Sequence, residues 1–166
     1  ISFADSWFVN SSTLTNQTDR ALRLNETSAE ETNSGFWNNT APTSTTFSLG
    51  NGISVSGQSY IAYCFKSISG YSKVGSYQGS TNNVSVTTGF QPTFILVKNT
   101  TYAGTNWTLW DNKRGGTDFL QPNNNGTEAS GRTVTFDSNG FTVDTNGAVN
   151  SNNNGDTFIY LAIKEN

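Results

Sequence analysis

Four residues around one predicted loop have side chains suited to binding a sugar: Trp107, Trp110, Asp111 and Lys113. An indole face covers the apolar C–H faces of a sugar ring, while carboxylate and other polar groups bind its hydroxyls. The pattern therefore predicts a candidate carbohydrate-binding site. In the alternative interpretation Trp107 belongs to the core, Trp110 is either core or partly exposed, and Lys113 lies in a solvated loop.

The residue types needed for most catalytic chemistry are missing. The chain has no His and a single Cys, which excludes Ser-His-Asp and Cys-His systems and thiolate zinc sites. No phosphate loop, nucleophile elbow or dinucleotide fingerprint occurs. A pair of carboxylates could hydrolyse a glycoside, but acidic residues such as Asp137 and Asp144 fall in turn-like settings. We therefore expect a protein that is not an enzyme and that uses no cofactor and no metal.

The composition favours an all-β protein. Charged residues make up 13% and aromatic residues 13% of the 166 positions, so Asn, Thr, Ser and Gly must supply the polar surface. Thr and aromatic residues suit strands, while Asn and Gly suit tight turns. The net charge is −3 and no basic run exists, which argues against a nucleic-acid partner. No apolar stretch approaches the roughly 18–20 residues of a membrane span, so we expect no membrane partner.

Alternating apolar and polar residues predict the strands that must position any site. Val134–Asp137 and Phe141–Asp144 flank Asn139-Gly140, which predicts a β-hairpin, and a similar hairpin is predicted around Asn51-Gly52. Tyr60–Phe65, Phe94–Val97 and Phe158–Ile163 are apolar throughout, as in strands covered on both faces. Cys64 lies in the first of these runs, so we expect a buried, unreactive thiol.

The blocks of sequence occur twice and in the same order. Trp7-Phe8-Val9 resembles Trp107-Thr108-Leu109, and Tyr60–Lys66 resembles Phe158–Lys164. We therefore predict an antiparallel β-sandwich or jelly-roll-like fold of two pseudo-repeated halves, with a first, partial copy in residues 1–69 and a second copy in residues 70–166. Gly89–Lys98 precedes the Trp block of the second copy and has no counterpart ahead of Trp7. We expect an open sheet edge there, filled by preceding residues of a longer chain or by another subunit.

A group of segments resembles a domain of uncharacterised function found in tail fibre and other virion structural proteins of marine phages. The segments are Trp37–Ser44, Tyr60–Phe65, Gly70–Gly79, Gly89–Lys98, Trp107–Arg114 and Ser138–Phe141. The resemblance covers the chain from about Trp7 to Glu165 and implies a role in a virion appendage, with no catalytic residues to carry over.

Three functions follow as expectations. The first is a non-enzymatic structural module of a phage virion appendage, such as a tail fibre, at a virion or extracellular location. The second is a receptor-binding, lectin-like module that binds a host surface glycan. The third is an extracellular or cell-surface filament subunit assembled by strand addition. Expected partners are other virion or appendage subunits, including copies of the chain in a homo-oligomer.

Overall fold

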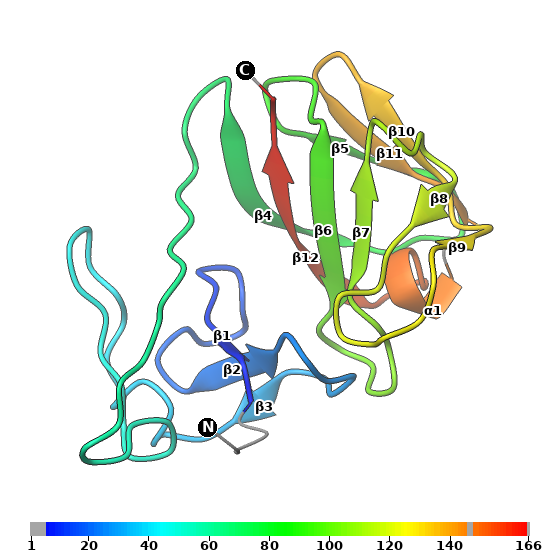
Figure 1. The fold of residues 1–166 in the computed structure, drawn as a ribbon. Helices are drawn as coiled ribbons and strands as arrows, with labels where there is room; N and C mark the ends of the chain where they lie inside the picture. The colour runs from blue at the N-terminus through cyan, green and yellow to red at the C-terminus, as the bar shows by residue number, and fades with distance from the viewer. Residues whose placement is uncertain (1–5, 146–147, 166) are drawn as a thin grey trace.

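The computed structural model of the chain describes residues 6–145 and 148–165, and their regular secondary structure is almost entirely β-strand, joined by long loops (Figure 1). This confirms the expected all-β class. The elements in chain order are β1 (Phe8–Val9), β2 (Arg20–Arg23), β3 (Glu31–Thr32), β4 (Ser72–Gln78), β5 (Val84–Thr87), β6 (Phe94–Asn99), β7 (Thr108–Asp111), β8 (Asp118–Phe119), β9 (Ala129–Ser130), β10 (Val134–Asp137), β11 (Gly140–Val143), α1 (Ala148–Ser151) and β12 (Thr157–Ile163).

Two sheets enclose the main core. One has the strand order β4-β12-β6-β7 and the other β10-β11-β5, and they lie against each other as the layers of a sandwich (Figure 1). All paired strands in both are antiparallel. The space between them holds the fully buried side chains of Ile95, Trp110, Phe141 and Phe158. Burial of such large apolar groups contributes roughly 1.5–3 kcal/mol each, which makes this the main source of stability.

The central strand β12 follows directly from its sequence. Its apolar run has no polar face to turn to solvent, and the structure covers it on both faces. Phe158 and Ala162 point into the main core, while Ile159 packs in a second cluster on the opposite face. β12 pairs with β4 along one side and with β6 along the other. The predicted strands at Phe94–Val97 and Phe158–Ile163 are therefore confirmed.

The predicted hairpin at Asn139-Gly140 forms. Gly140 is required there because a side chain would not fit, not because the turn needs a positive φ. Phe136 pairs with Phe141, and Asp137 pairs with Gly140, so β10 and β11 are joined by a two-residue turn. Gly140 is not at positive φ. A Cβ on Gly140 would instead lie 2.0 Å from the carbonyl oxygen of Val86 in the adjacent strand β5.

Gly140→Ala should therefore lower the free energy of unfolding by roughly 1–3 kcal/mol, because the backbone of β5 must move away from the new methyl group. Gly126→Ala is the matched control: the nearest atom to its new Cβ is the side-chain oxygen of Asn124, 2.9 Å away, which can swing aside. Chemical denaturation followed by far-ultraviolet circular dichroism measures both variants. Equal stabilities would show that β11 and β5 accommodate the added methyl group without loss.

A smaller unit packs on the outer face of the four-stranded sheet. It contains the sheet β1-β2-β3 and the loops around it. Leu14 and Leu22 from this unit meet Trp107 and Ile159 from the large sandwich in one buried cluster. The four-stranded sheet thus packs against β5, β10 and β11 on one face, and the small unit packs on part of the other face.

Strand pairs in the small unit have counterparts in the sandwich with the same register. Val9 pairs with Leu22 as Leu109 pairs with Leu120. The residue pairs between β2 and β3 correspond in the same way to those between β8 and β9. They are Arg20↔Thr32 with Asp118↔Ser130, and Ala21↔Glu31 with Phe119↔Ala129. The strand trio β1-β2-β3 is therefore the structural counterpart of β7, β8 and β9.

Other predictions for the first copy are wrong. Tyr60–Lys66 is not a strand, and no hairpin forms around Asn51-Gly52. Cys64 is exposed, not buried. Residues 59–67 form a single trace that leads from the small unit to the start of β4 (Figure 1). The strand-like sequences of this copy thus lack the partners that their counterparts have in the second copy.

Candidate functional site

The four residues predicted to bind a sugar do not form an exposed site. Trp107 and Trp110 are 3% and 0% exposed, so neither ring offers a face to a ligand. Trp110 lies in the main core, where its indole Nε1 donates a hydrogen bond to the carbonyl oxygen of Arg132 at 3.2 Å. The prediction of a sugar-stacking face at Trp110 is therefore corrected: the alternative interpretation, with both rings in the core, describes the structure.

Asp111 and Lys113 have local structural partners. The carboxylate of Asp111 accepts hydrogen bonds from the backbone N–H groups of Lys113 and Arg114, both at 3.0 Å, and it also forms an ion pair with the Arg114 side chain. Lys113 Nζ lies 3.3 Å from a carboxylate oxygen of Glu165 and its side chain is 75% exposed. These contacts fix the turn after β7 and leave no convergent set of polar groups.

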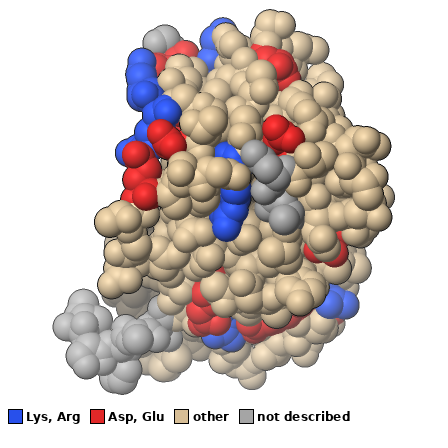
Figure 2. All heavy atoms as spheres, turned by 90° about the vertical axis from the view of Figure 1, so that its right-hand side faces the viewer, with Lys and Arg blue, Asp and Glu red and all other residues tan. Residues whose placement is uncertain are grey.

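On the face at the right of Figure 1, no cluster of charged side chains marks another candidate binding site. Acidic and basic residues are sparse there and scattered among uncharged residues (Figure 2). Among the described residues, no group of three or more His, Cys, Asp or Glu side chains could hold a metal ion. No helix in the described part of the chain is long and apolar enough to cross a membrane.

The candidate site is a groove of about 1520 Å³ beside the small unit. The first wall is β1 with its flanking residues 6–12, the second wall is formed by residues 58–67, and residues 42–47 also line the groove. The floor is the outer face of the four-stranded sheet, at Val74, Leu96 and Leu161. We call this space the β1 groove.

The second wall of the β1 groove exposes apolar side chains that a monomer normally buries. Ile61, Tyr63 and Phe65 are 77%, 69% and 60% exposed. Contiguous exposed apolar surface of this kind marks an interaction site. The ring of Tyr63 stacks on Trp7 of the first wall, with centroids 6.3 Å apart and planes 17° apart.

The backbone of the second wall is also unpaired. Within the described residues, no backbone group of residues 59–67 forms a hydrogen bond with another backbone group. One carbonyl in this stretch, that of Lys66, accepts a bond from Ser72 Oγ at 2.6 Å. Unpaired N–H and C=O groups beside apolar side chains are the features of a sheet edge that accepts another strand.

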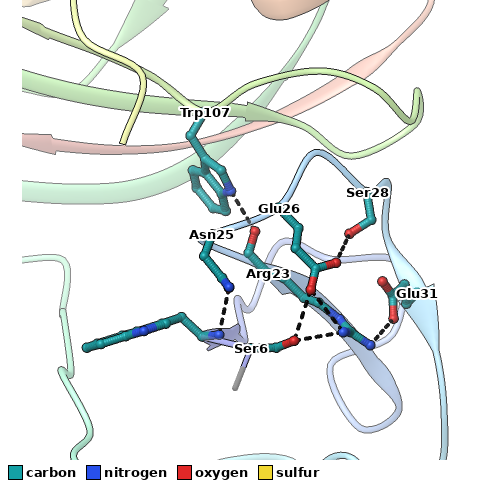
Figure 3. A network of polar contacts seen from close by, with 8 residues as sticks. Ser6, Arg23, Asn25, Glu26, Ser28, Glu31 and Trp107 are labelled. Carbon is teal, nitrogen blue, oxygen red and sulfur yellow. Dashed lines mark hydrogen bonds and ion pairs between the residues drawn. The ribbon is translucent and has the colours of Figure 1, made fainter. Parts of the chain in front are cut away.

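The first wall is held in place by Arg23. Its guanidinium donates to Ser6 Oγ at 2.7 Å, to Glu26 at 3.1 Å and to Glu31 at 3.0 Å (Figure 3). It also lies 5.1 Å from the ring centroid of Phe8 in β1, at cation–π distance. These contacts join β1, β2, β3 and the turn after β2 into one body.

The acidic and basic groups in this network stabilise each other's charged forms. Burial opposes the charge on Arg23, but the hydrogen bond and charge of Glu26 and the charge of Glu31 outweigh it and raise the pKa of Arg23. Burial likewise opposes the charge on Glu26, yet hydrogen bonds from Ser6 and Arg23 lower its pKa. The backbone carbonyl of Arg23 also accepts a 2.9 Å bond from Trp107 Nε1, which ties the small unit to the sandwich (Figure 3).

Arg23→Met should lower the free energy of unfolding by roughly 1–2 kcal/mol, because two partly buried carboxylates lose their cation while the apolar stem is kept. Lys113→Met is the control: it breaks an exposed pair with Glu165, and the expected change is within about 0.5 kcal/mol. Urea denaturation of both variants gives the comparison. If Arg23→Met is as stable as its control, the network does not hold the groove wall.

One family model, described as "Domain of unknown function (DUF7483)", matches residues 1–166. No curated protein and no solved structure matches the chain.

Proposed function

We propose that this chain, which belongs to the DUF7483 family, is a non-enzymatic structural module of a phage virion appendage, such as a tail fibre. The observation that carries the proposal is the repeated β unit, with the same strand register in both copies. Units that repeat one pattern and pack on their neighbours are how extended proteins are built. The sequence resemblance to virion structural proteins of marine phages supplies the location.

The surface agrees with a structural role. The apolar side chains that line the β1 groove come with unpaired backbone groups, which suits binding of another polypeptide segment better than binding of a small molecule. The polar side chains of the predicted sugar site are occupied in holding a turn. Partners in this proposal are other appendage subunits, including further copies of the chain.

Immunogold electron microscopy tests the location. An antibody raised against residues 1–166 should label an appendage of purified virus particles, with pre-immune serum as the control. Label that is confined to filaments on cells would overturn the virion assignment in favour of a cell-surface filament subunit.

A parallel assay of host polysaccharides should release no reducing ends. Release that is lost when a single Asp or Glu is replaced would overturn the non-enzyme assignment.

A receptor-binding, lectin-like module is the second candidate, and the Trp7–Tyr63 stack favours it. Trp7 is 53% exposed and Tyr63 is 69% exposed, and exposed aromatic faces are suited to sugar rings. On an array of host-surface glycans, a lectin would bind selectively and Trp7→Ala would remove the binding. Tyr102→Ala, which removes an isolated ring that is 57% exposed, is the matched control.

A further inference from the structure

The chain contains five Asn-Gly pairs, and an Asn-Gly pair carries both partners of an intramolecular reaction. The backbone nitrogen of the glycine can attack the side-chain carbonyl carbon of the preceding asparagine, and glycine has no side chain to hinder the approach. One pair, Asn146-Gly147, lies outside the described residues. The asparagines of the other four pairs are all exposed, so the state of each glycine nitrogen decides which pair reacts; these pairs are Asn51-Gly52, Asn125-Gly126, Asn139-Gly140 and Asn154-Gly155.

In three of the four described pairs the backbone holds the glycine nitrogen in place. Gly52 N donates a hydrogen bond to the carbonyl oxygen of Gly35 at 2.9 Å, and Gly155 N donates to that of Gly79 at 3.1 Å. Gly140 is buried in β11, the middle strand of its sheet. Attack by any of these nitrogens requires a backbone segment to separate from its neighbour, which is a local unfolding event with its own free-energy cost.

The nitrogen of Gly126 is held only by a side chain. It donates to Asn124 Oδ1 at 2.9 Å, and the Asn124 amide nitrogen in turn donates to Gln121 Oε1 at 2.8 Å. Asn124, Asn125 and Gly126 are all exposed, and within the described residues no hydrogen bond involves the Asn125 side chain. Rotation of the Asn124 side chain therefore frees the Gly126 nitrogen without any change in the sheets.

The loop that carries this pair is fixed at its base and open at its tip. At the base, Leu120 and Leu109 exchange two backbone hydrogen bonds of 2.9 Å. Asn123 Oδ1 accepts a 2.9 Å bond from the backbone N–H of Trp107. Residues 124–128 beyond it are all exposed. A covalent change at the tip should therefore leave the fold intact, because the contacts that position the loop lie ahead of it.

We propose that Asn125 is a site of spontaneous covalent modification, in which its side-chain amide is converted to a carboxylate. The Gly126 nitrogen attacks the side-chain carbonyl carbon of Asn125 and forms a five-membered imide ring. The bond from that carbon to the amide nitrogen breaks, and ammonia leaves with the proton given up by the glycine nitrogen. Water then opens the ring at either carbonyl and leaves aspartate or isoaspartate at position 125. No electrons are transferred, and water is the only co-reactant.

The reaction would add one negative charge to a chain whose net charge is −3. The new carboxylate would lie at the exposed tip, three residues ahead of Glu128, whose own carboxylate is paired with Arg114 at 2.7 Å. In a protein that is not replaced after it is made, the converted fraction increases with age. This inference does not depend on the proposed virion role.

Peptide mass spectrometry of the 166-residue chain, incubated in mildly alkaline buffer, tests the site. Fragment spectra distinguish conversion at Asn125 from conversion at Asn123 or Asn124. In the folded chain Asn125 should convert faster than the asparagines of the other three described pairs by roughly tenfold or more, because only those pairs need local opening. In concentrated urea, which removes the backbone contacts, all four should convert at similar rates.

Gly126→Ala is the variant that tests the mechanism. Its Cβ would meet only the side-chain oxygen of Asn124, so the fold is kept, while the methyl group hinders attack by the nitrogen. Conversion at Asn125 should fall by roughly tenfold. Thr127→Ala, which alters the next residue and leaves the pair intact, should retain the parent rate. The proposal is overturned if Asn125 converts no faster than the other three in the folded chain, or if Gly126→Ala converts as fast as Thr127→Ala.

Discussion

Trp110→Ala is expected to lower the free energy of unfolding by about 3–5 kcal/mol. The Trp110 side chain is 0% exposed, it lies within the main core, and its ring centroid is 6.1 Å from that of Phe119. The variant leaves a large cavity between the two sheets and leaves the carbonyl oxygen of Arg132 without its indole donor. Urea denaturation followed by far-ultraviolet circular dichroism measures the loss without relying on tryptophan fluorescence.

Trp7→Ala is the matched control, because it removes the same side chain from a position that is 53% exposed. The expected change is less than about 1 kcal/mol. The pair also separates a core residue from a ligand-binding residue. A Trp110→Ala variant that keeps its stability and loses binding to a glycan would restore the sugar site that the structure argues against.

The free energy of unfolding is expected to rise by roughly 2–3 kcal/mol between about pH 8 and pH 10. The reason is that burial in the folded state disfavours the charged form of Lys98. Its side chain is 0% exposed, and its Nζ donates to the carbonyl oxygen of Asn99 at 2.9 Å and to Thr105 Oγ1 at 2.8 Å. No carboxylate forms an ion pair with it in the described part of the chain. Burial therefore lowers the pKa of Lys98 from 10.5 to about 8.

The direction follows from proton counts. Between pH 8 and 10.5 the unfolded chain keeps the Lys98 proton and the folded chain has lost it, so removing protons favours the folded state. Above about pH 10 the trend reverses, because burial raises the pKa values of Tyr77 and Tyr160 above 10.0 and the unfolded tyrosines ionise first. Stability should therefore pass through a maximum near pH 10.

Lys98→Met tests the assignment, since it keeps the volume of the stem and removes the charge. The rise between pH 8 and 10 should disappear, and stability at pH 7 should be equal to or above that of the parent chain. Lys164→Met, at an exposed position just after β12, should retain the rise. Persistence of the rise in Lys98→Met would assign it to another group.

The sequence predicted strands well where all their partners are in the described chain. The runs in β6 and β12 and the hairpin of β10 and β11 formed as expected, because alternation and turn residues specify a strand locally and the neighbouring strands are present. Tyr60–Lys66 carries the same pattern and stays unpaired. A hydrophobic run reports that a segment is suited to burial between strands, and it carries no information on whether those strands are available.

The predicted sugar site failed for a related reason. Trp107, just ahead of β7, and Trp110, within it, lie on opposite faces of the sheet, and the local sequence could not show that both rings are covered. The small unit packs on the Trp107 face and β10 with β11 on the Trp110 face, and these contacts link residues far apart in the sequence. Asp111 was similarly ambiguous, since a carboxylate that fixes its own turn has the same local sequence as one that binds a ligand.

The pairing of β4 with β12 determines how the sandwich would respond to a mechanical load. The chain enters this unit at Ser72 and leaves it at Ile163, and these two residues are paired directly at one end of the sheet. Because antiparallel hydrogen bonds lie perpendicular to the strands, tension between these points pulls along the bonds and breaks the pairs one after another from that end. The strand pairs would therefore separate sequentially at low force. Mechanical resistance of the sandwich would then depend on contacts that hold this end of β4 and β12 together.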